Sequence, residues 1–371
     1  MTAGSSLTLE LHGVRLRLES DIEPFAAYVR AAMEPYLCEG DGEADITSRL
    51  QWVDGFASRD LARAFPGRGW QRRPDRDLYL DADSAAWLRI DDFPDLQLAM
   101  DWTGQRLELT GRYHFHVGSG AGLERLRRLR HRGGLDRLRG RRFSTLLYYL
   151  VYHPILWQLG RREGWSVLHA GAVAAPQGAI VLAGMPGCGK STLAVAMLAE
   201  ERRRMMSDNL VLHDGDRVRS CPELLLLDER SRARAGQGAS RLVATGERRV
   251  YERDALRIDR GEDRPQAPLA IVNVGRARAT ALESLGAAEC AARIVAGNTM
   301  AKEVRRIAIM GEVLDLVAGT ERPDEQAMLG RLAERAPCYQ LWIEQDAPLD
   351  AVISEHLEPL LAARAGRRVG T

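Results

Sequence analysis

The chain has 371 residues, of which 45% are hydrophobic and 28% charged, with a formal net charge of +1. This composition is typical of a globular protein of two or three domains. The near-neutral charge excludes a global field that attracts nucleic acid or anionic lipid. Five cysteines without a Cys-x-x-Cys pair favour free thiols over a disulfide framework or a zinc site. We expect a cytoplasmic protein with no signal peptide and no nucleic-acid partner.

Residues 1–120 are predicted to form an α+β N-terminal domain. Alternating residues in LTLELHGVRLRLE predict two strands around a turn at His12-Gly13. The following segment, DIEPFAAYVRAAMEPYL, has helical spacing and begins with Asp21, which we expect to cap the helix. Alternating segments up to residue 118 predict a meander of strands. No catalytic constellation is visible, so we interpret this domain as a substrate-recognition unit or a scaffold.

Residues 121–165 are interpreted as an Arg-rich helical connector. Residues 121–142 carry nine arginines against Glu124 and Asp136, and leucines recur every three residues, which indicates a helix. One hypothesis is a docking surface for an acidic peptide or protein substrate. A solvated helix face is the alternative that we favour.

The segment from Phe143 to Gly160 contains no Asp, Glu, Lys or Arg. Its length approaches that of a membrane span. It also contains His153, Gln158 and Pro154, which would kink a helix. We therefore expect a buried helix followed by a short second helix, without stable membrane insertion.

A phosphate-binding loop is the strongest motif in the chain. The sequence GMPGCGKST matches the pattern G-x-x-x-x-G-K-[ST] in full, with an apolar strand-like run before it and helix-forming residues after it. Strand, glycine turn and helix aim backbone N–H groups at a phosphate. The candidate ATP ligands are Gly184, Met185, Pro186, Gly187, Cys188, Gly189, Lys190, Ser191 and Thr192. We expect the Ser191 hydroxyl to bind Mg²⁺, and we interpret Cys188 as a small residue that its position tolerates.

The composition strengthens the assignment of Lys190 as a phosphate ligand. Of the 52 Lys and Arg residues, only Lys190 and Lys302 are lysines. A compact ammonium reaches between the β- and γ-phosphates, where a planar guanidinium fits poorly.

A kinase also needs a carboxylate near the loop, and the sequence offers two. Asp208 follows soon after the helix that the loop is expected to begin. Asp228 ends the run LLLLDE, a pattern that many ATPases use, but no LSGGQ-type signature lies between it and the loop. We favour Asp208, and we interpret LLLLDE as a core strand.

The segments LHAGAV, GMPGCGKST and MMSDNLVL together resemble the catalytic core of the HPr kinase/phosphorylase superfamily. The resemblance is strong over residues 166–220 and weaker toward the C-terminus. It implies that residues 166–371 form an α/β P-loop kinase domain of the HPr kinase / phosphoenolpyruvate carboxykinase type. It also implies that His169 lies beside the catalytic Asp208, and that Asp208 takes the proton from a seryl hydroxyl. A lone His at a strand start otherwise favours a simple turn or core residue.

Two departures distinguish this chain from the family. The second Asp of the family is Asn209 here, and its E-I-R-G-L-G stretch has no counterpart. These departures indicate a divergent relative with another acceptor. Some such relatives phosphorylate ribosomally made peptides.

The sequence therefore predicts ATP- and Mg²⁺-dependent phosphorylation of a Ser or Thr hydroxyl in a peptide or protein. Lys190 and the loop would hold the phosphates, Ser191 and Asp208 the metal, and Asp208 would act as the base, oriented by His169. Two alternatives stay open: a small-molecule kinase on the same fold, and a non-catalytic nucleotide-binding regulatory module, which Asn209 permits. The acceptor, a reverse phosphorylase activity and a homo-oligomer are left open by the sequence.

Overall fold

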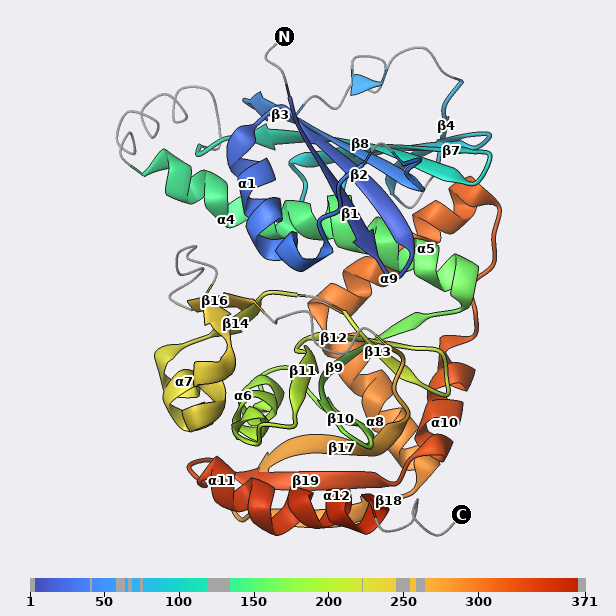
Figure 1. Ribbon diagram of the computed structural model, residues 1–371. Helices are drawn as coiled ribbons and strands as arrows, with labels where there is room; N and C mark the ends of the chain where they lie inside the picture. The colour runs from blue at the N-terminus through green and yellow to red at the C-terminus, as the bar shows by residue number, and fades with distance from the viewer. Residues whose placement is uncertain are drawn as a thin grey trace. The chain divides into compact units, whose positions relative to one another are not determined.

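The computed structural model describes residues 4–40, 42–57, 64–65, 69–73, 76–118, 134–221, 223–244, 254–257 and 264–365. The chain divides into two compact units (Figure 1). The first comprises Met1–Leu159 and Ile309–Glu321, and the second comprises Gly160–Ala308 and Arg322–Thr371. Two helices therefore contribute to both units: α5 (His153–Glu163) and α9 (Lys302–Ala318).

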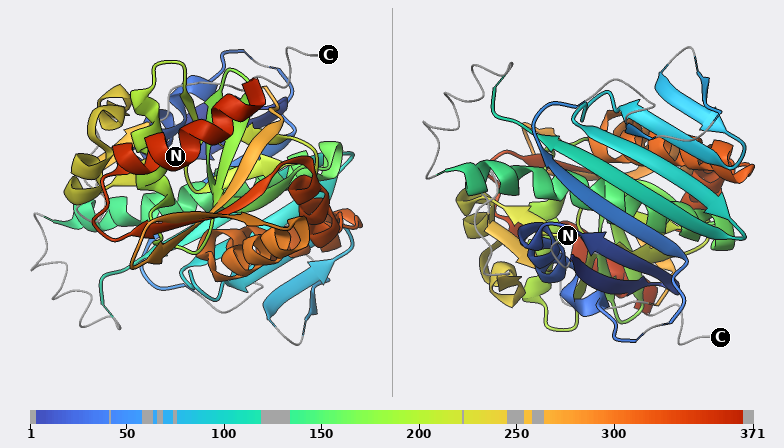
Figure 2. Two further views of the ribbon diagram at one scale, coloured as in Figure 1. Left: turned by 90° about the horizontal axis from the view of Figure 1, so that it is seen from below. Right: turned by 90° about the horizontal axis from the view of Figure 1, so that it is seen from above.

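An eight-stranded mixed sheet forms the first unit (Figure 2), in the order β1-β2-β3-β8-β7-β6-β5-β4. The pairs β2·β3 and β3·β8 are parallel, and the others are antiparallel. The strands are β1 Ser5–Leu11, β2 Val14–Ser20, β3 Ile46–Asp54, β4 Gln71–Arg72, β5 Asp77–Asp81, β6 Ser84–Arg89, β7 Leu96–Thr103 and β8 Arg106–Phe115. The unit also contains α1 Glu23–Met33 and α4 Leu135–Leu147.

The predicted N-terminal hairpin is confirmed, but the predicted helix cap is wrong. β1 and β2 pair through a turn at His12 and Gly13, both of which have positive φ. Ile22 occupies the N-cap position of α1 without a side-chain bond. The Asp21 carboxylate instead accepts a hydrogen bond from the backbone N–H of Trp52 at 2.9 Å. The Asp21 side chain therefore binds the backbone of Trp52 on β3 instead of capping α1.

The apolar segment 143–160 is continuous helix rather than two separate helices. The end of α4 runs through a π-helical turn at Tyr148–Tyr152 into α5, and Pro154 lies in the first turn of α5. A proline inside a continuous helix removes one backbone hydrogen bond, and the π-helical turn directly before Pro154 is where the helix departs from regular α geometry. Among the described residues, no helix is long and apolar enough to cross a membrane.

Most of the Arg-rich segment 121–142 lies outside the described residues, which resume at Gly134. Within α4, Arg139 pairs with Asp54 at 3.2 Å and with Asp136 at 3.4 Å. Its guanidinium also lies 5.5 Å from the ring centroid of Phe115. This arginine therefore packs within its own unit.

The second unit is built on a sheet of order β13-β12-β9-β10-β17-β19-β18, with β11 also paired to β9. β10, β17 and β19 are mutually parallel, whereas β9 runs antiparallel to β10. The strands are β9 Ser166–Ala175, β10 Gly178–Ala183, β11 Arg204–Ser207, β12 Leu210–His213, β13 Val218–Ser220, β17 Pro268–Ala277, β18 Ala281–Leu285 and β19 Cys338–Glu344. A separate three-stranded sheet comprises β14 Leu225–Leu227, β15 Val243–Ala244 and β16 Asp254–Arg257.

Helices cover both faces of the second unit's sheet. The helices are α6 Lys190–Ala196, α7 Glu229–Ala235, α8 Ala287–Met300, α9, α10 Glu325–Arg335, α11 Leu349–Val352 and α12 Glu358–Ala365. On one face, a buried cluster joins Leu193 of α6 to Val274 and Leu357. On the other, Ile294 of α8 and Leu332 of α10 pack on the strands. Burial on both faces explains why these strands read as continuous apolar runs.

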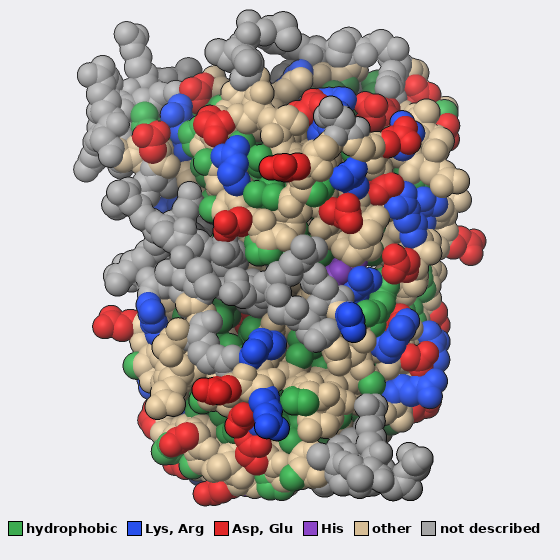
Figure 3. All heavy atoms as spheres, in the orientation of Figure 1, with side chains coloured by type: hydrophobic (Ala, Val, Ile, Leu, Met, Phe, Trp, Pro, Cys, Tyr) green, Lys and Arg blue, Asp and Glu red, His purple; other side chains and the backbone are tan. Residues whose placement is uncertain are grey.

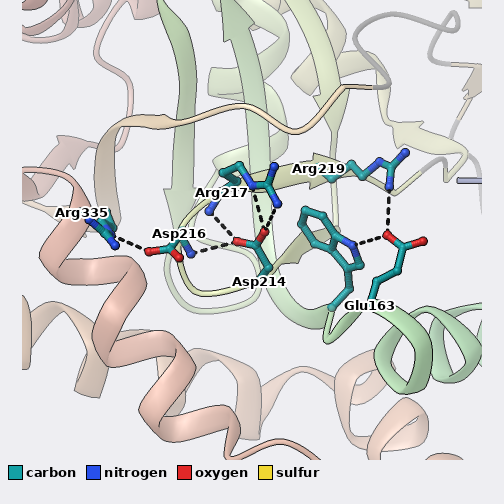
Figure 4. A network of polar contacts seen from close by, with 7 residues as sticks. Glu163, Asp214, Asp216, Arg217, Arg219 and Arg335 are labelled. Carbon is teal, nitrogen blue, oxygen red and sulfur yellow. Dashed lines mark hydrogen bonds and ion pairs between the residues drawn. The ribbon is translucent and has the colours of Figure 1, made fainter.

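A network of polar contacts fixes the corner where α5 leads into β9 (Figure 4). Glu163 accepts a hydrogen bond from the indole N–H of Trp165 at 3.0 Å and lies 3.7 Å from Arg219. The guanidinium groups of Arg217 and Arg219 both lie over the Trp165 ring. Asp214 holds Arg217 through two bonds of 3.0 and 2.8 Å. The β12–β13 turn is thereby tied to the start of β9.

Charges of both signs are interspersed on one face of the molecule. On the face that Figure 3 draws, Lys and Arg side chains alternate with Asp and Glu. This distribution agrees with the formal net charge of +1.

The buried His213 on β12 makes the protein sensitive to acid. Its side chain is fully buried, and burial lowers its pKa to about 4, with Asp214 raising the pKa and Arg331 lowering it. His213 becomes protonated in the unfolded chain as the pH falls through about 6.5. In the folded chain it stays neutral down to about pH 4, so the unfolded state is favoured between these pH values. Stability from this site is therefore present above pH 6.5 and is lost below it.

We expect His213→Gln to reduce this acid sensitivity. Between pH 7 and pH 5, the wild type should lose about 2 kcal/mol of unfolding free energy through His213. The variant should lose correspondingly less, as measured by urea unfolding at the two pH values. An equal loss in both proteins would contradict the role of His213.

Candidate functional site

The predicted phosphate loop connects the end of β10 to the start of α6. β10 ends at Ala183 and α6 begins at Lys190, so the loop lies at the carboxyl end of the parallel strands, where α/β sheets bind ligands. Gly184 has a φ of +130°, and a Cβ atom there would lie 2.4 Å from the Val274 carbonyl oxygen. Only glycine fits this close approach to β17.

The loop residues differ in their exposure. Met185, Pro186 and Gly187 are exposed, and Ser191 and Thr192 are partly buried. Cys188 is only 7% exposed and belongs to the core cluster beneath α6. Its packing supports the interpretation of Cys188 as a small structural residue.

Lys190 is buried, and its ammonium is held by the loop itself. Nζ donates to the carbonyl oxygens of Gly184 at 2.9 Å and Met185 at 3.0 Å, and it lies 3.0 Å from Nε2 of His169. Burial lowers the pKa of Lys190, whereas Cys188 and Asp208 raise it. Three donors of one ammonium thus meet three acceptors.

His169 on β9 is kept neutral by its surroundings. Burial, followed by the charge of Lys190, lowers its pKa to about 4, against a smaller opposing effect of Asn209. A neutral ring can offer the lone pair of Nε2 to the ammonium of Lys190. The structure thus brings His169 to the loop lysine.

Asp208 lies between β11 and β12 and is buried. Burial raises its pKa to about 6, while a hydrogen bond from the Ser191 side chain and the charge of Lys190 lower it. Its Oδ1 has no hydrogen-bond partner within the described part of the chain. A buried carboxylate oxygen without a partner is costly, and a metal ion or an acceptor hydroxyl would satisfy it.

Asn298 is a site residue that the sequence analysis missed. β9 extends past the end of β10, because Ala183 pairs with Ala170. The backbone N–H of His169 donates instead to Oδ1 of Asn298, on α8, at 2.8 Å. The preceding Gly297 packs on the loop, since a Cβ atom there would lie 3.3 Å from the Gly184 oxygen. No local motif marks this contact across 129 residues.

Asp228 has a structural role. It is the N-cap of α7, and its side chain accepts a hydrogen bond from the Ser231 N–H at 2.7 Å. The LLLLDE strand becomes β14, which lies in the separate three-stranded sheet and not beside β10. The geometry gives Asp208 the position next to Ser191 and Lys190.

The donor set fits a magnesium–nucleotide complex better than a metal bound by protein alone. No group of three or more His, Cys, Asp or Glu side chains gathers for a metal among the described residues. Mg²⁺ typically takes one or two protein oxygens together with phosphates and water. Ser191 and Asp208 are the two side chains that would hold it here.

Comparison with known proteins leaves the chain without an assigned family. No protein-family model matches it, and a search of curated proteins finds no match.

We expect Asn298→Ala to loosen β9 at His169. Removing the acceptor leaves the His169 N–H without a partner, at a cost of about 1 kcal/mol, or roughly fivefold in local opening. Hydrogen exchange of the peptide that contains His169 should rise by that factor. Asn298→Asp, the control, keeps an oxygen at the same position and should exchange as the wild type does. Equal acceleration in both variants would contradict the role of the side-chain oxygen.

Proposed function

We propose that the second unit is a Mg²⁺- and ATP-dependent kinase that phosphorylates a Ser or Thr hydroxyl of a peptide or protein. The observation that carries the proposal is the gathering of Lys190, Ser191, Asp208 and His169 around one glycine loop at the carboxyl ends of parallel strands. Phosphoryl transfer needs positioning and charge stabilisation more than covalent chemistry, and these residue types supply both.

In this proposal, Lys190 exchanges its loop acceptors for the nucleotide phosphates. The carbonyl oxygens of Gly184 and Met185 and the ring of His169 hold the ammonium at the loop. Triphosphate oxygens are stronger acceptors than these neutral groups. His169 then stays neutral, so it does not repel the Lys190 ammonium. Ser191 and Asp208 would hold Mg²⁺, which would supply charge neutralisation for the phosphates.

Asp208 receives the proton of the acceptor hydroxyl. Ser191 lowers the pKa of this carboxyl group, and Oδ1 has no hydrogen-bond partner in the described chain. With a pKa of about 6, the carboxylate is mostly ionised at neutral pH. A base is most effective when its pKa lies near the working pH, and this pKa does.

A regulatory nucleotide-binding module is the second candidate. Asn209 stands beside His169, where the resembling family has a second Asp, so one negative charge is missing. A site with a single carboxylate can bind nucleotide without transferring phosphate.

Product analysis separates the two candidates. The full chain is incubated with γ-labelled ATP, Mg²⁺ and a degenerate library of Ser- and Thr-containing peptides. The kinase proposal predicts labelled peptide, identified as phosphoserine or phosphothreonine by mass spectrometry. Tight ATP binding with label in neither peptide nor inorganic phosphate would favour the regulatory module.

We expect Asp208→Asn to separate binding from chemistry. Loss of a positioned base should lower the rate of phosphoryl transfer about a hundredfold, whereas the affinity for ATP should change only a few-fold. Asp228→Asn is the matched control, because asparagine is an equally good helix cap. The account fails if Asp208→Asn transfers phosphate at the wild-type rate, or if Asp228→Asn is the slow variant.

A further inference from the structure

Arg276, at the carboxyl end of β17, lies against the phosphate loop. A Cβ atom at Gly189 would come within 2.9 Å of Nη2 and 3.5 Å of Cζ of Arg276. Side chains alternate along a strand, so Arg276 extends on the same face as Val274, which packs in the core beneath α6. The guanidinium therefore covers the last glycine before Lys190.

This guanidinium keeps most of its donors available. Its one hydrogen bond within the described chain is a long one, 3.4 Å from Nη1 to the carbonyl oxygen of Gln345. No carboxylate of the described residues pairs with Arg276, whose side chain is exposed. An arginine has five N–H donors arranged for a bidentate bond to an oxyanion. The Arg276 guanidinium therefore lies where it could bind an anion held by the loop.

A second arginine is held at the same short segment after β19, residues 345–347, that Arg276 contacts. Arg234 of α7 donates to the Ala347 carbonyl oxygen at 3.2 Å. Burial lowers its pKa, the nearby charge of Arg276 lowers it further, and the charge of Asp346 raises it. The neighbouring carboxylate, Asp346, pairs with Arg230 at 3.0 Å. Arg234 and Arg276 therefore place two like charges at the segment that follows β19, and a bound anion would stabilise both.

We propose that Arg276, supported by Arg234, binds the phosphates that remain on the nucleotide after transfer. In phosphate loops, backbone amides hold the α- and β-phosphates while the lysine reaches the β- and γ-phosphates. Arg276 covers Gly189, whereas Nζ of Lys190 lies at the other end of the loop beside Gly184. Arg276 is thus a binding residue for ATP and ADP alike. The inference rests on the proposed nucleotide site and adds a ligand to it.

The test compares dissociation constants of MgATP and MgADP by calorimetry with the full chain. Arg276→Ala should weaken both nucleotides by the same factor of about tenfold or more. Arg276→Lys should also weaken both, because a point charge cannot replace the fork. Arg230→Ala, which removes an arginine already paired with Asp346, is the control and should bind as the wild type does.

Each other outcome overturns a defined part of the proposal. Weaker binding of MgATP alone would indicate that Arg276 contacts the transferred phosphate, which would contradict the inference. If neither Arg276 variant changes the dissociation constants, Arg276 does not bind the nucleotide and only contacts Gln345. If Arg276→Ala fails to fold, Arg276→Lys keeps the stem and the charge and still gives the comparison. A wild type that binds neither nucleotide would overturn the proposed function together with this inference.

Discussion

A single buried ammonium organises the candidate site. The three donors of Lys190 meet the oxygens of Gly184 and Met185 and the neutral ring of His169. These contacts connect the loop to β9, and the charge of Asp208 raises the pKa of Lys190. Because the ammonium is desolvated, each contact is worth more than it would be in water, and the loss of one leaves a costly unpaired donor. The positions of His169, Asp208 and the loop are therefore interdependent.

The electrostatic balance of the site follows from this burial. Desolvation pushes His169 toward its neutral form and Asp208 toward its protonated form. Lys190 acts on both groups in the direction that its positive charge requires, against protonation of His169 and in favour of ionised Asp208. Two titratable groups with opposite tendencies, near one cation, are typical of functional sites.

Local patterns in the sequence predicted much of the second unit. The strand β10 before the loop, the helix α6 after it and the strand of LLLLDE all follow from apolar runs, turn residues and helix-forming residues. The short helix α7, capped by Asp228, was not predicted from the sequence. Short helices that pack on a core are difficult to recognise because their stability comes from tertiary contacts.

The long-range contacts could not be predicted from the sequence. Asn298 reaches His169 only because β10 ends one residue before the N–H of His169 would find a strand partner. Arg276 is one of 50 arginines in the chain. Its place beside Gly189 comes from the parallel pairing of β17 with β10. Such positions depend on strand order, which a single sequence does not encode in any local pattern.

The claim that residues 184–192 hold a phosphate is tested most directly by hydrogen exchange at the loop amides. Backbone N–H groups that bind a phosphate should exchange slowly only when the phosphate is present. On addition of MgATP, peptides that cover Gly184 to Thr192 should gain protection in the wild type and gain little in Lys190→Ala. Protection that appears only in other segments, or protection of the loop that Lys190→Ala leaves intact, would contradict the account.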